Sequence, residues 1–431
     1  MTKQSSRDSQ GRPVIVVTGM GVVTALGIGK DDNWRALTGG QSGIRQIGRF
    51  ATDGLRTTVA GEIDFLDTGI YNSAAMCMEI AGRAIEEAIG EAGIGARGAF
   101  PGPLIAAVPP FEIEWPLRLE LASRVGENAM RANDKFSSLL AQAGKGELTP
   151  NFEFAQPECV AEWLADRFGT RGQPISLSTA CASGASAIQF GVEAIRRGES
   201  DAALCVGTDA TVNPESLVRF SLLSALSTRN DPPEAAARPF SKDRDGFVMG
   251  EGAAALVIES LDSANARGAN ILGVVRGCGE RADSFHRTRS NPDASAIIGA
   301  LSNALADAGA EPDEIDYVNP HGTGTPENDK MEYLSLAAVL GDHLPNVPVS
   351  SNKSMIGHTL SAAGTIEAVF SLMTIASGTL PPTINYDTPD PDIPLDVVPN
   401  QKRDQAVTTV LSNSFGFGGQ NVSLVLAAEP D

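Results

Sequence analysis

The sequence predicts an α/β fold. Short runs of β-branched and aliphatic residues alternate along the chain with longer segments whose apolar residues recur at helical spacing. The short runs are apolar throughout, which is typical of strands covered by helices on both faces. With 431 residues and 42% hydrophobic content, the chain can form one large domain or two coupled halves. The alternation therefore favours a parallel or mixed sheet with helices packed against it.

The first half supplies four predicted strands and two predicted helices. The strands are expected at residues 14–18, 104–108, 203–206 and 255–259, and the helices at Ser73–Ala92 and 182–197. Residues 109–172 break this pattern because they combine long polar stretches with Trp115 and Trp163. We interpret them as an insertion or cap on the core.

The second half repeats the same style. Helices are expected at Ser295–Ala308 and 330–340, and strands at 315–319, 349–351, 407–412 and 422–427. Residues 379–400 contain six prolines, which predicts an extended surface loop. No short repeat period is present, so a solenoid is excluded.

The charge of the chain argues against several classes of partner. The formal net charge is −20, which disfavours nucleic acid and anionic membranes, so an acidic partner would need a local basic patch. The five cysteines form no CxxC pair, and the four histidines show no HExxH spacing. A disulfide framework and a structural zinc site are therefore not expected.

The N-terminal segment is polar and lacks the apolar core of a secretory signal. We find no apolar stretch of about 18 residues and expect no membrane span. These features predict a cytoplasmic protein in a reducing compartment, with residues 1–12 forming a loose tail.

Cys181 is the first candidate functional residue. It lies in Ile-Ser-Leu-Ser-Thr-Ala-Cys-Ala-Ser-Gly, where a short apolar run meets a predicted helix that ends at Arg196-Arg197-Gly198. At a helix N-terminus the dipole and free N–H groups favour the nucleophilic thiolate. The alternative is a buried structural cysteine, which is the interpretation given to Cys77, Cys205 and Cys278.

Two histidines follow predicted strands. His321 lies in Asn-Pro-His-Gly-Thr-Gly-Thr-Pro, and His358 follows Lys353 by five residues across a turn that contains Gly357. Ligands of open α/β sheets bind at the carboxyl ends of strands, which favours a functional role for His321. A surface lysine and a capping histidine are the alternatives for the second pair.

Two glycine-rich stretches complete the candidate sites. Residues 413–421, Asn-Ser-Phe-Gly-Phe-Gly-Gly-Gln-Asn, offer backbone N–H groups suited to an oxyanion hole, or simply a hairpin connection. Residues 17–27 begin like a dinucleotide fingerprint but lack the third glycine of GxGxxG, so nucleotide binding is not favoured.

Taken together, Ser-Thr-Ala-Cys-Ala-Ser-Gly, Asn-Pro-His-Gly-Thr-Gly-Thr-Pro, Asn-Lys-Ser-Met-Ile-Gly-His and the 413–421 stretch resemble the β-ketoacyl-acyl carrier protein synthases of the chain-elongating kind. The resemblance covers nearly the whole chain after residue 12. It implies the thiolase fold, a five-layered α-β-α-β-α arrangement of two similar halves, placed here at 13–262 and 263–431. It also implies a homodimer, an acyl carrier protein as partner and no organic cofactor.

The resemblance also implies residue roles. Cys181 matches the family nucleophile, His321 and His358 match its two histidines, and Lys353 matches its lysine with Glu367 in support. Phe417 matches a gating residue whose N–H joins that of Cys181 in the oxyanion hole. Supporting roles are assigned to the remaining motif residues Thr323, Thr325 and Phe415. The implied reaction is decarboxylative condensation of a malonyl thioester with an acyl group on Cys181.

The sequence departs from the family pattern in two places. Residues 108–116 replace a glycine-rich stretch that in the family helps to form the acyl pocket and the dimer contact. Ser224 stands where many relatives have an arginine that meets the carrier protein, and Arg219 is a candidate substitute. These departures suggest a specialised member for long or modified acyl chains. A polyketide-type ketosynthase and a non-catalytic partner subunit resembling a chain-length factor stay open as alternatives.

Overall fold

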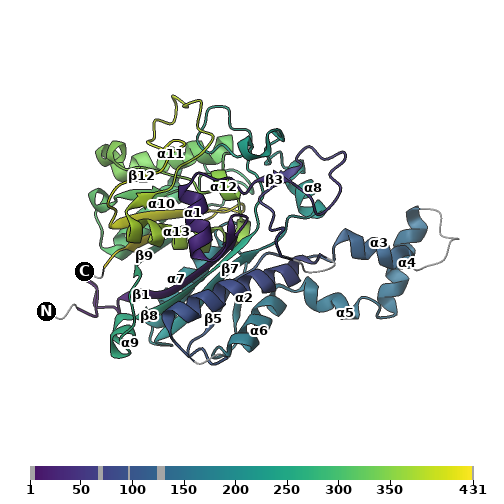
Figure 1. Cartoon of the computed structure of the whole chain (residues 1–431), viewed down its shortest axis with the longest axis horizontal. Helices are drawn as coiled ribbons and strands as arrows, with labels where there is room; N and C mark the ends of the chain where they lie inside the picture. The colour runs from purple at the N-terminus through teal and green to yellow at the C-terminus, as the bar shows by residue number, and fades with distance from the viewer. Residues whose placement is uncertain (1–4, 67–70, 96–97, 124–131, 430–431) are drawn as a thin grey trace.

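A mixed sheet forms the centre of the molecule (Figure 1). The computed structural model describes residues 5–66, 71–95, 98–123 and 132–429. The strands follow one hydrogen-bonded path, β10-β13-β14-β9-β1-β8-β7-β5-β6, and β2 pairs with β1 at its side. The path comprises β1 (Ile15–Thr24), β5 (Leu104–Ala107), β6 (Ile175–Leu177), β7 (Ala202–Asp209), β8 (Gly252–Ser260), β9 (Gly273–Ala282), β10 (Tyr317–Asn319), β13 (Thr409–Phe415) and β14 (Gln420–Ala427), with β2 at Gly27–Ile28.

The path consists of two halves that are joined weakly. Only two residue pairs, Val16 with Val274 and Val17 with Gly273, connect β1 to β9. Strands β5, β6 and β7 are mutually parallel in one half, and β10 is parallel to β13 in the other, while the remaining pairs are antiparallel. We propose the boundary between the halves near residue 262, because β8 and β9 lie on either side of it.

Helices lie on both sides of each half sheet. The helices α7 (Ser183–Arg196) and α13 (Ala363–Ser377) contact each other and strands of both halves. Helix α2 (Ser73–Ala92) packs on β1, β7 and β8, and α10 (Ser295–Ala308) packs on β9 and β14. The order of the layers is therefore helix, sheet, helices α7 and α13, sheet, helix.

The side chains of β8 show why this order is stable. Ala254, Leu256 and Ile258 face the core around α7 and α13, whereas the alternate residues 253, 255 and 257 face the core under α2. Because both faces of the strand are buried, its sequence is apolar at every one of these positions. Each fully buried leucine or isoleucine contributes about 1.5–3 kcal/mol relative to an exposed one.

Helix α13 corrects one expectation from the sequence. The window Leu360–Ser377 has a mean hydropathy of 1.4 and is long and apolar enough to cross a membrane, although no such stretch was expected. Protein covers 78% of this window, since α13 lies between the two half sheets. Its apolar composition reflects burial on all sides in the core.

The described parts of residues 109–172 form a largely helical segment. It contains α3 (Trp115–Ser123), α4 (Ala132–Gly144), α5 (Thr149–Phe152), a 3-10 turn at Glu153–Ala155 and α6 (Pro157–Phe168). Helix α6 packs on α2, whereas α3, α4 and α5 extend away from the body in Figure 1. Large apolar side chains are exposed on this extension, among them Leu119, Leu140 and Phe152.

Most predicted elements are confirmed. The helices Ser73–Ala92 and Ser295–Ala308 have the predicted bounds, and the 379–400 segment is a loop apart from β11 at Thr379–Leu380. The predicted strand at 349–351 is wrong, because Val349 makes one isolated bridge to Val318 before the Ser350 hydroxyl turns to the carbonyl of Pro381. Residues 17–24 continue β1 without a phosphate-binding turn.

Shorter elements connect this frame. They are α1 (Lys30–Thr38), β3 (Arg45–Gln46), β4 (Val59–Ala60), α8 (Pro214–Leu222), α9 (Leu261–Ala266), α11 (Pro326–Leu340), α12 (Lys353–Ile356) and β12 (Arg403–Asp404), with 3-10 turns at Pro233–Ala235, Pro312–Glu314, Gly341–Asn346 and Leu360–Ala362. The loops that precede α7, α11 and α13, together with the loop between β13 and β14, carry the candidate site.

Candidate active site

Cys181 lies in a tight turn between β6 and α7. The helix begins at Ser183, two residues after the cysteine, and Ala180 has the unusual φ of 51°. The Ser183 hydroxyl fixes the turn, because it donates to the Ala180 carbonyl at 2.6 Å and accepts the Thr179 N–H at 2.8 Å. The predicted strand-to-helix turn is therefore confirmed, and the thiol sits at the N-terminal end of a buried helix.

The resting state of Cys181 differs from the expectation of a favoured thiolate. Burial raises the pKa of the thiol to about 12, and it outweighs the opposing effects of the Lys353 charge and the Phe417 N–H group. The side chain is only 9% exposed, so its charged form would lose most of its hydration. At neutral pH the resting residue is a thiol.

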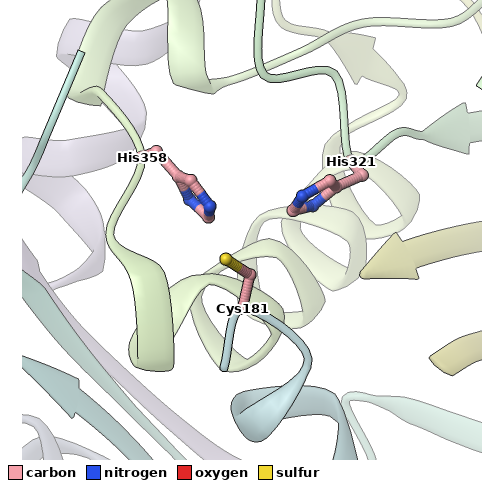
Figure 2. Close-up of side chains that lie close together, drawn as sticks. All are labelled: Cys181, His321 and His358. Carbon is pink, nitrogen blue, oxygen red and sulfur yellow. The ribbon is translucent and has the colours of Figure 1, made fainter. Parts of the chain in front are cut away.

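Two histidines face this thiol. Figure 2 shows both imidazole rings pointing toward the Cys181 sulfur from separate loops. Ligand-type atoms of Cys181, His321 and His358 all lie within 4.8 Å of one another, and the two ring centroids are 5.2 Å apart. His321 follows β10 and His358 follows α12, so the fold joins residues that are far apart in the sequence.

Both histidines are neutral. Burial lowers the pKa of each ring well below its usual value, and the nearby Lys353 charge lowers it further. The Leu360 N–H donates to Nδ1 of His358 at 3.3 Å, which places the single proton of that neutral ring on Nε2. Within the described part of the chain, this Nε2 has no hydrogen-bond partner, so its donor is available to a substrate oxygen.

Lys353 and Glu367 form a buried ion pair behind the histidines. Both side chains are almost inaccessible, at 3% and 2% exposure. Burial raises the pKa of Glu367 to about 7, while the Lys353 charge opposes this rise. The structure thus brings together the lysine and glutamate that the family resemblance paired. The positive charge of Lys353 lies close enough to lower the pKa of both histidines.

The glycine-rich loop after β13 closes over the cysteine. Phe417 directs its backbone N–H to the Cys181 sulfur, and Phe415 packs against His321 with ring centroids 5.7 Å apart. Gly419 has a φ of 88°, and a Cβ there would lie 1.9 Å from the Asp283 carbonyl oxygen. Only glycine fits at that position, which keeps the Phe417 N–H aimed at the reacting centre.

The two predicted threonines lie at the wall of the same pocket. The hydroxyl oxygens of Thr323 and Thr325 are 2.9 Å apart, and Thr325 also caps α11 by accepting the Asn328 N–H. The pocket encloses about 660 Å³ with its open mouth, and Cys181, both histidines, Phe415 and Phe417 line its inner end. Exposed Arg287 and Arg289 lie along its wall.

Two positioning residues were missed from the sequence. Glu332 on α11 accepts the backbone N–H groups of His321 at 2.8 Å and Gly322 at 2.7 Å. Phe247 packs edge-on against His358 with ring centroids 5.3 Å apart. The acidic pair Asp329 and Glu332, three residues apart in the helix that follows the His321 motif, was the available signal for the first of these.

The cysteine and the two histidines are also a possible ligand set for a soft metal ion. Their ligand atoms all lie within 4.8 Å of one another. A metal ion held there would occupy the sulfur of Cys181. The arrangement is better suited to a thioester, with two N–H donors on one side and a sulfur on the other.

Comparison with known proteins agrees with this geometry. The beta-ketoacyl synthase N-terminal domain matches residues 12–88 and 122–264, and the C-terminal domain matches residues 272–387. The chain belongs to the beta-ketoacyl synthase family. It is therefore an enzyme of the acyltransferase class with the thiolase fold.

Individual relatives of this beta-ketoacyl synthase cover nearly its whole length. It is 37% identical to 3-oxoacyl-[acyl-carrier-protein] synthase 2 of Coxiella burnetii (strain RSA 493 / Nine Mile phase I). The alignment covers 96% of this chain and 98% of that relative. A beta-ketoacyl synthase structure from Burkholderia phymatum STM815 matches with a TM-score of 0.82 and 31% identity, covering 96% of this chain and 99% of that one. A type II polyketide ketosynthase, in complex with its acyl-carrier protein and bound to a hexaketide, matches with a TM-score of 0.83 and 29% identity. The match covers 97% of this chain and 100% of that one.

Proposed function

We propose that this enzyme is a 3-oxoacyl-[acyl-carrier-protein] synthase that extends an acyl group by two carbons. The observation that carries the proposal is the meeting of Cys181 with two neutral histidines within 4.8 Å. A nucleophile beside two neutral N–H donors suits a reaction that first forms a thioester and then stabilises an enolate. The 37% identity to a curated 3-oxoacyl synthase supports the same reaction.

The first half-reaction moves the acyl group to the enzyme. The Cys181 sulfur attacks the acyl thioester carbonyl, and the carrier thiolate leaves with the proton that the thiol gives up. The N–H groups of Cys181 and Phe417 would hold the oxyanion of the tetrahedral intermediate, because Phe417 already points its N–H at the sulfur. With a thiol pKa of about 12, deprotonation must accompany attack rather than precede it.

The second half-reaction uses the histidines. A malonyl thioester loses carbon dioxide, and its carbonyl oxygen gains the negative charge of an enolate. The Nε2–H of His358, together with His321, would donate to that oxygen. The enolate carbon then attacks the acyl-cysteine carbonyl, the Cys181 thiolate leaves, and the high thiol pKa favours its return to the neutral form by proton uptake. Lys353 would orient the histidines and, by its charge, keep them neutral.

An acyl carrier protein is the proposed partner, as in the polyketide ketosynthase complex. This enzyme has a net charge of −20, so an acidic carrier would need a local basic patch. Arg287 and Arg289 supply a local positive charge at the pocket that leads to Cys181. Arg219, the earlier candidate for contact with the carrier protein, forms an ion pair with Glu112. We therefore prefer Arg287 and Arg289 for this contact.

A homodimer is proposed from the exposed edge of the sheet. Strand β6 ends the strand path, and its Ile175 is 46% exposed. Unpaired edge strands with exposed apolar side chains are prone to pair with another chain. We also propose a cytoplasmic location, which agrees with five free cysteines.

Two alternatives remain as outcomes of the test. A polyketide-type ketosynthase would use the same residues on another acyl chain, and the polyketide relatives are compatible with it. A non-catalytic subunit resembling a chain-length factor would leave Cys181 without acyl adducts. Mass spectrometry of the intact protein after incubation with acyl-carrier protein separates the non-catalytic subunit from the two enzymes, and the acyl chains that are accepted separate the two enzymes. An adduct that Cys181→Ala abolishes supports the proposal, and absence of any adduct on the unmodified enzyme overturns it.

A further inference from the structure

A second cavity lies on the other side of the loop that precedes α8. It encloses about 300 Å³ with its opening, and its walls come from the 110–114 segment and the start of α8. Thr211 and Asn213 line this cavity, whereas Val212 between them packs in the apolar cluster that contains Cys181. The cavity is therefore separated from the nucleophile by the thickness of one extended segment.

The two sites also share α8. Ser216 borders the second cavity, and Phe220, one helical turn later, lines the pocket of Cys181. Asp209 links them electrostatically, since it accepts the Thr211 hydroxyl at 2.6 Å and its charge raises the pKa of Cys181. Ser216 and Phe220 are separated by about 6 Å along the axis of α8, from the 1.5 Å rise per residue, so a chain that leaves the Cys181 pocket at Phe220 has one helical turn to cover.

Two buried carboxylates line this cavity. Glu114 is 9% exposed and accepts the Ser73 N–H at 2.9 Å and its hydroxyl at 2.5 Å. Glu215 is 8% exposed, and its Oε1 accepts the N–H of Trp115. These contacts fasten the 112–115 segment to the starts of α2 and α8.

One oxygen of the Glu215 carboxylate is not used in these contacts. Within the described part of the chain, Oε2 of Glu215 is buried and has no hydrogen-bond partner. The nearby arginines are engaged elsewhere, because Arg219 pairs with Glu112, and Arg49 pairs with Glu62 and Glu251. A buried carboxylate oxygen without a donor costs free energy, so a donor from outside the chain would be bound favourably.

We propose that this cavity binds a hydroxyl group of the acyl chain carried on Cys181, which makes the enzyme selective for hydroxylated acyl groups. This inference rests on the proposed acyl transfer to Cys181. A hydroxyl both donates and accepts, and the cavity offers both partners, with Glu215 Oε2 as acceptor and the Ser216 hydroxyl as donor. An ammonium group only donates and would lose more hydration beside Pro110 and Phe111.

The departure of residues 109–116 from the family pattern fits this reading. Pro110 and Phe111 form an apolar wall, and Glu112 and Glu114 add acidic side chains to the same short segment. A purely hydrocarbon chain would gain nothing from Glu215 and would further isolate its free oxygen from water. The lining therefore predicts discrimination against acyl chains that carry no hydroxyl group.

The test compares matched acyl groups in the intact enzyme. Octanoyl, decanoyl and dodecanoyl pantetheine thioesters and their ω-hydroxy counterparts are incubated with the protein, and the rate of Cys181 acylation is followed by mass spectrometry. We expect the hydroxylated group to react about 10-fold faster at one of the three lengths, which corresponds to about one well-made hydrogen bond to a charged group. Equal rates at every length would overturn the inference and leave the proposed acyl transfer standing.

Variants of Glu215 assign the effect. Glu215→Leu should remove the preference for the hydroxyl group, measured as the ratio of the acylation rates of the hydroxylated and plain acyl groups. Glu215→Gln keeps an acceptor oxygen and should retain most of the preference. Thermal melting of each variant separates specificity from folding, and the preference of the unmodified enzyme decides the matter even if Glu215→Leu does not fold. If no thioester acylates Cys181 at all, the proposed function and this inference fail together.

Discussion

The carboxylate of Glu332 holds the backbone N–H of His321 at 2.8 Å, so a residue on α11 sets the position of a loop histidine without touching its ring. The second oxygen of Glu332 accepts the Gly322 N–H at 2.7 Å. Both N–H groups are buried, and each would otherwise lack an acceptor. The His321 loop is therefore fixed through its backbone, while the imidazole stays free to meet the substrate.

Replacement of Glu332 by Gln should loosen this loop. The amide offers one oxygen, and its NH2 group would face the second backbone N–H, which costs about 1–3 kcal/mol. We expect malonyl decarboxylation to slow by 10-fold or more with little change in acylation of Cys181, measured as separate half-reactions. Glu162→Gln on the exposed face of α6 is the matched control and should change neither rate. Equal loss in both half-reactions would argue against a specific role at His321.

Alkylation of Cys181 should depend steeply on pH. Because burial raises the thiol pKa to about 12, the thiolate fraction grows about tenfold with each pH unit from 7 to 10. The rate of iodoacetamide labelling, followed by mass spectrometry of the peptide that contains Cys181, should rise across this range without reaching a plateau. A plateau below pH 8 would show that the helix N-terminus prevails over burial.

His358→Ala should separate the two half-reactions. The variant loses the Nε2–H donor that we propose for the thioester oxygen, but the thiol and the Phe417 N–H remain. Removal of one such donor costs about 100-fold to 1,000-fold in rate. We expect release of carbon dioxide from malonyl thioester to fall by this factor, while the acyl adduct on Cys181 still forms. Unchanged decarboxylation would contradict the role assigned to His358.

The Lys353–Glu367 pair should be strongly coupled. Lys353→Met leaves a buried carboxylate without its cation, and the loss of one partner of such a pair costs about 3–5 kcal/mol. The double variant Lys353→Met/Glu367→Leu should be more stable than the single variant in urea unfolding, although both should have lost condensation activity. Additive losses of stability would mean that the pair is not energetically linked.

The edge strand β6 offers a test of the proposed homodimer. Ile175→Lys places a charge on the exposed edge, which should oppose pairing with a second copy. Light scattering coupled to size-exclusion chromatography should then show a monomer in place of a dimer at micromolar concentration. Phe285→Lys, at an exposed apolar residue away from β6, is the control and should leave the mass unchanged. A monomer for the unmodified protein would refute the dimer.

Local sequence patterns predicted much of the fold. The bounds of α2 and α10 were predictable because apolar spacing and flanking residues define a helix within its own segment. The strand at 349–351 was predicted wrongly because the chain there is held by the Pro381 carbonyl, a partner 31 residues away. Residues 360–377 were not predicted as the central helix, since helical spacing is weak when every face is buried.

The sequence by itself identified the candidate reacting groups, because Cys181, His321, Lys353, His358 and Phe417 stand in motifs that can be read in order. Only the tertiary structure decided their protonation. The helix position alone predicted a thiolate, whereas enclosure by several loops keeps Cys181 a thiol and both histidines neutral. Glu332 and the free oxygen of Glu215 likewise emerged only from the structure. Desolvation and partner geometry depend on residues brought together by folding, and no local pattern records them.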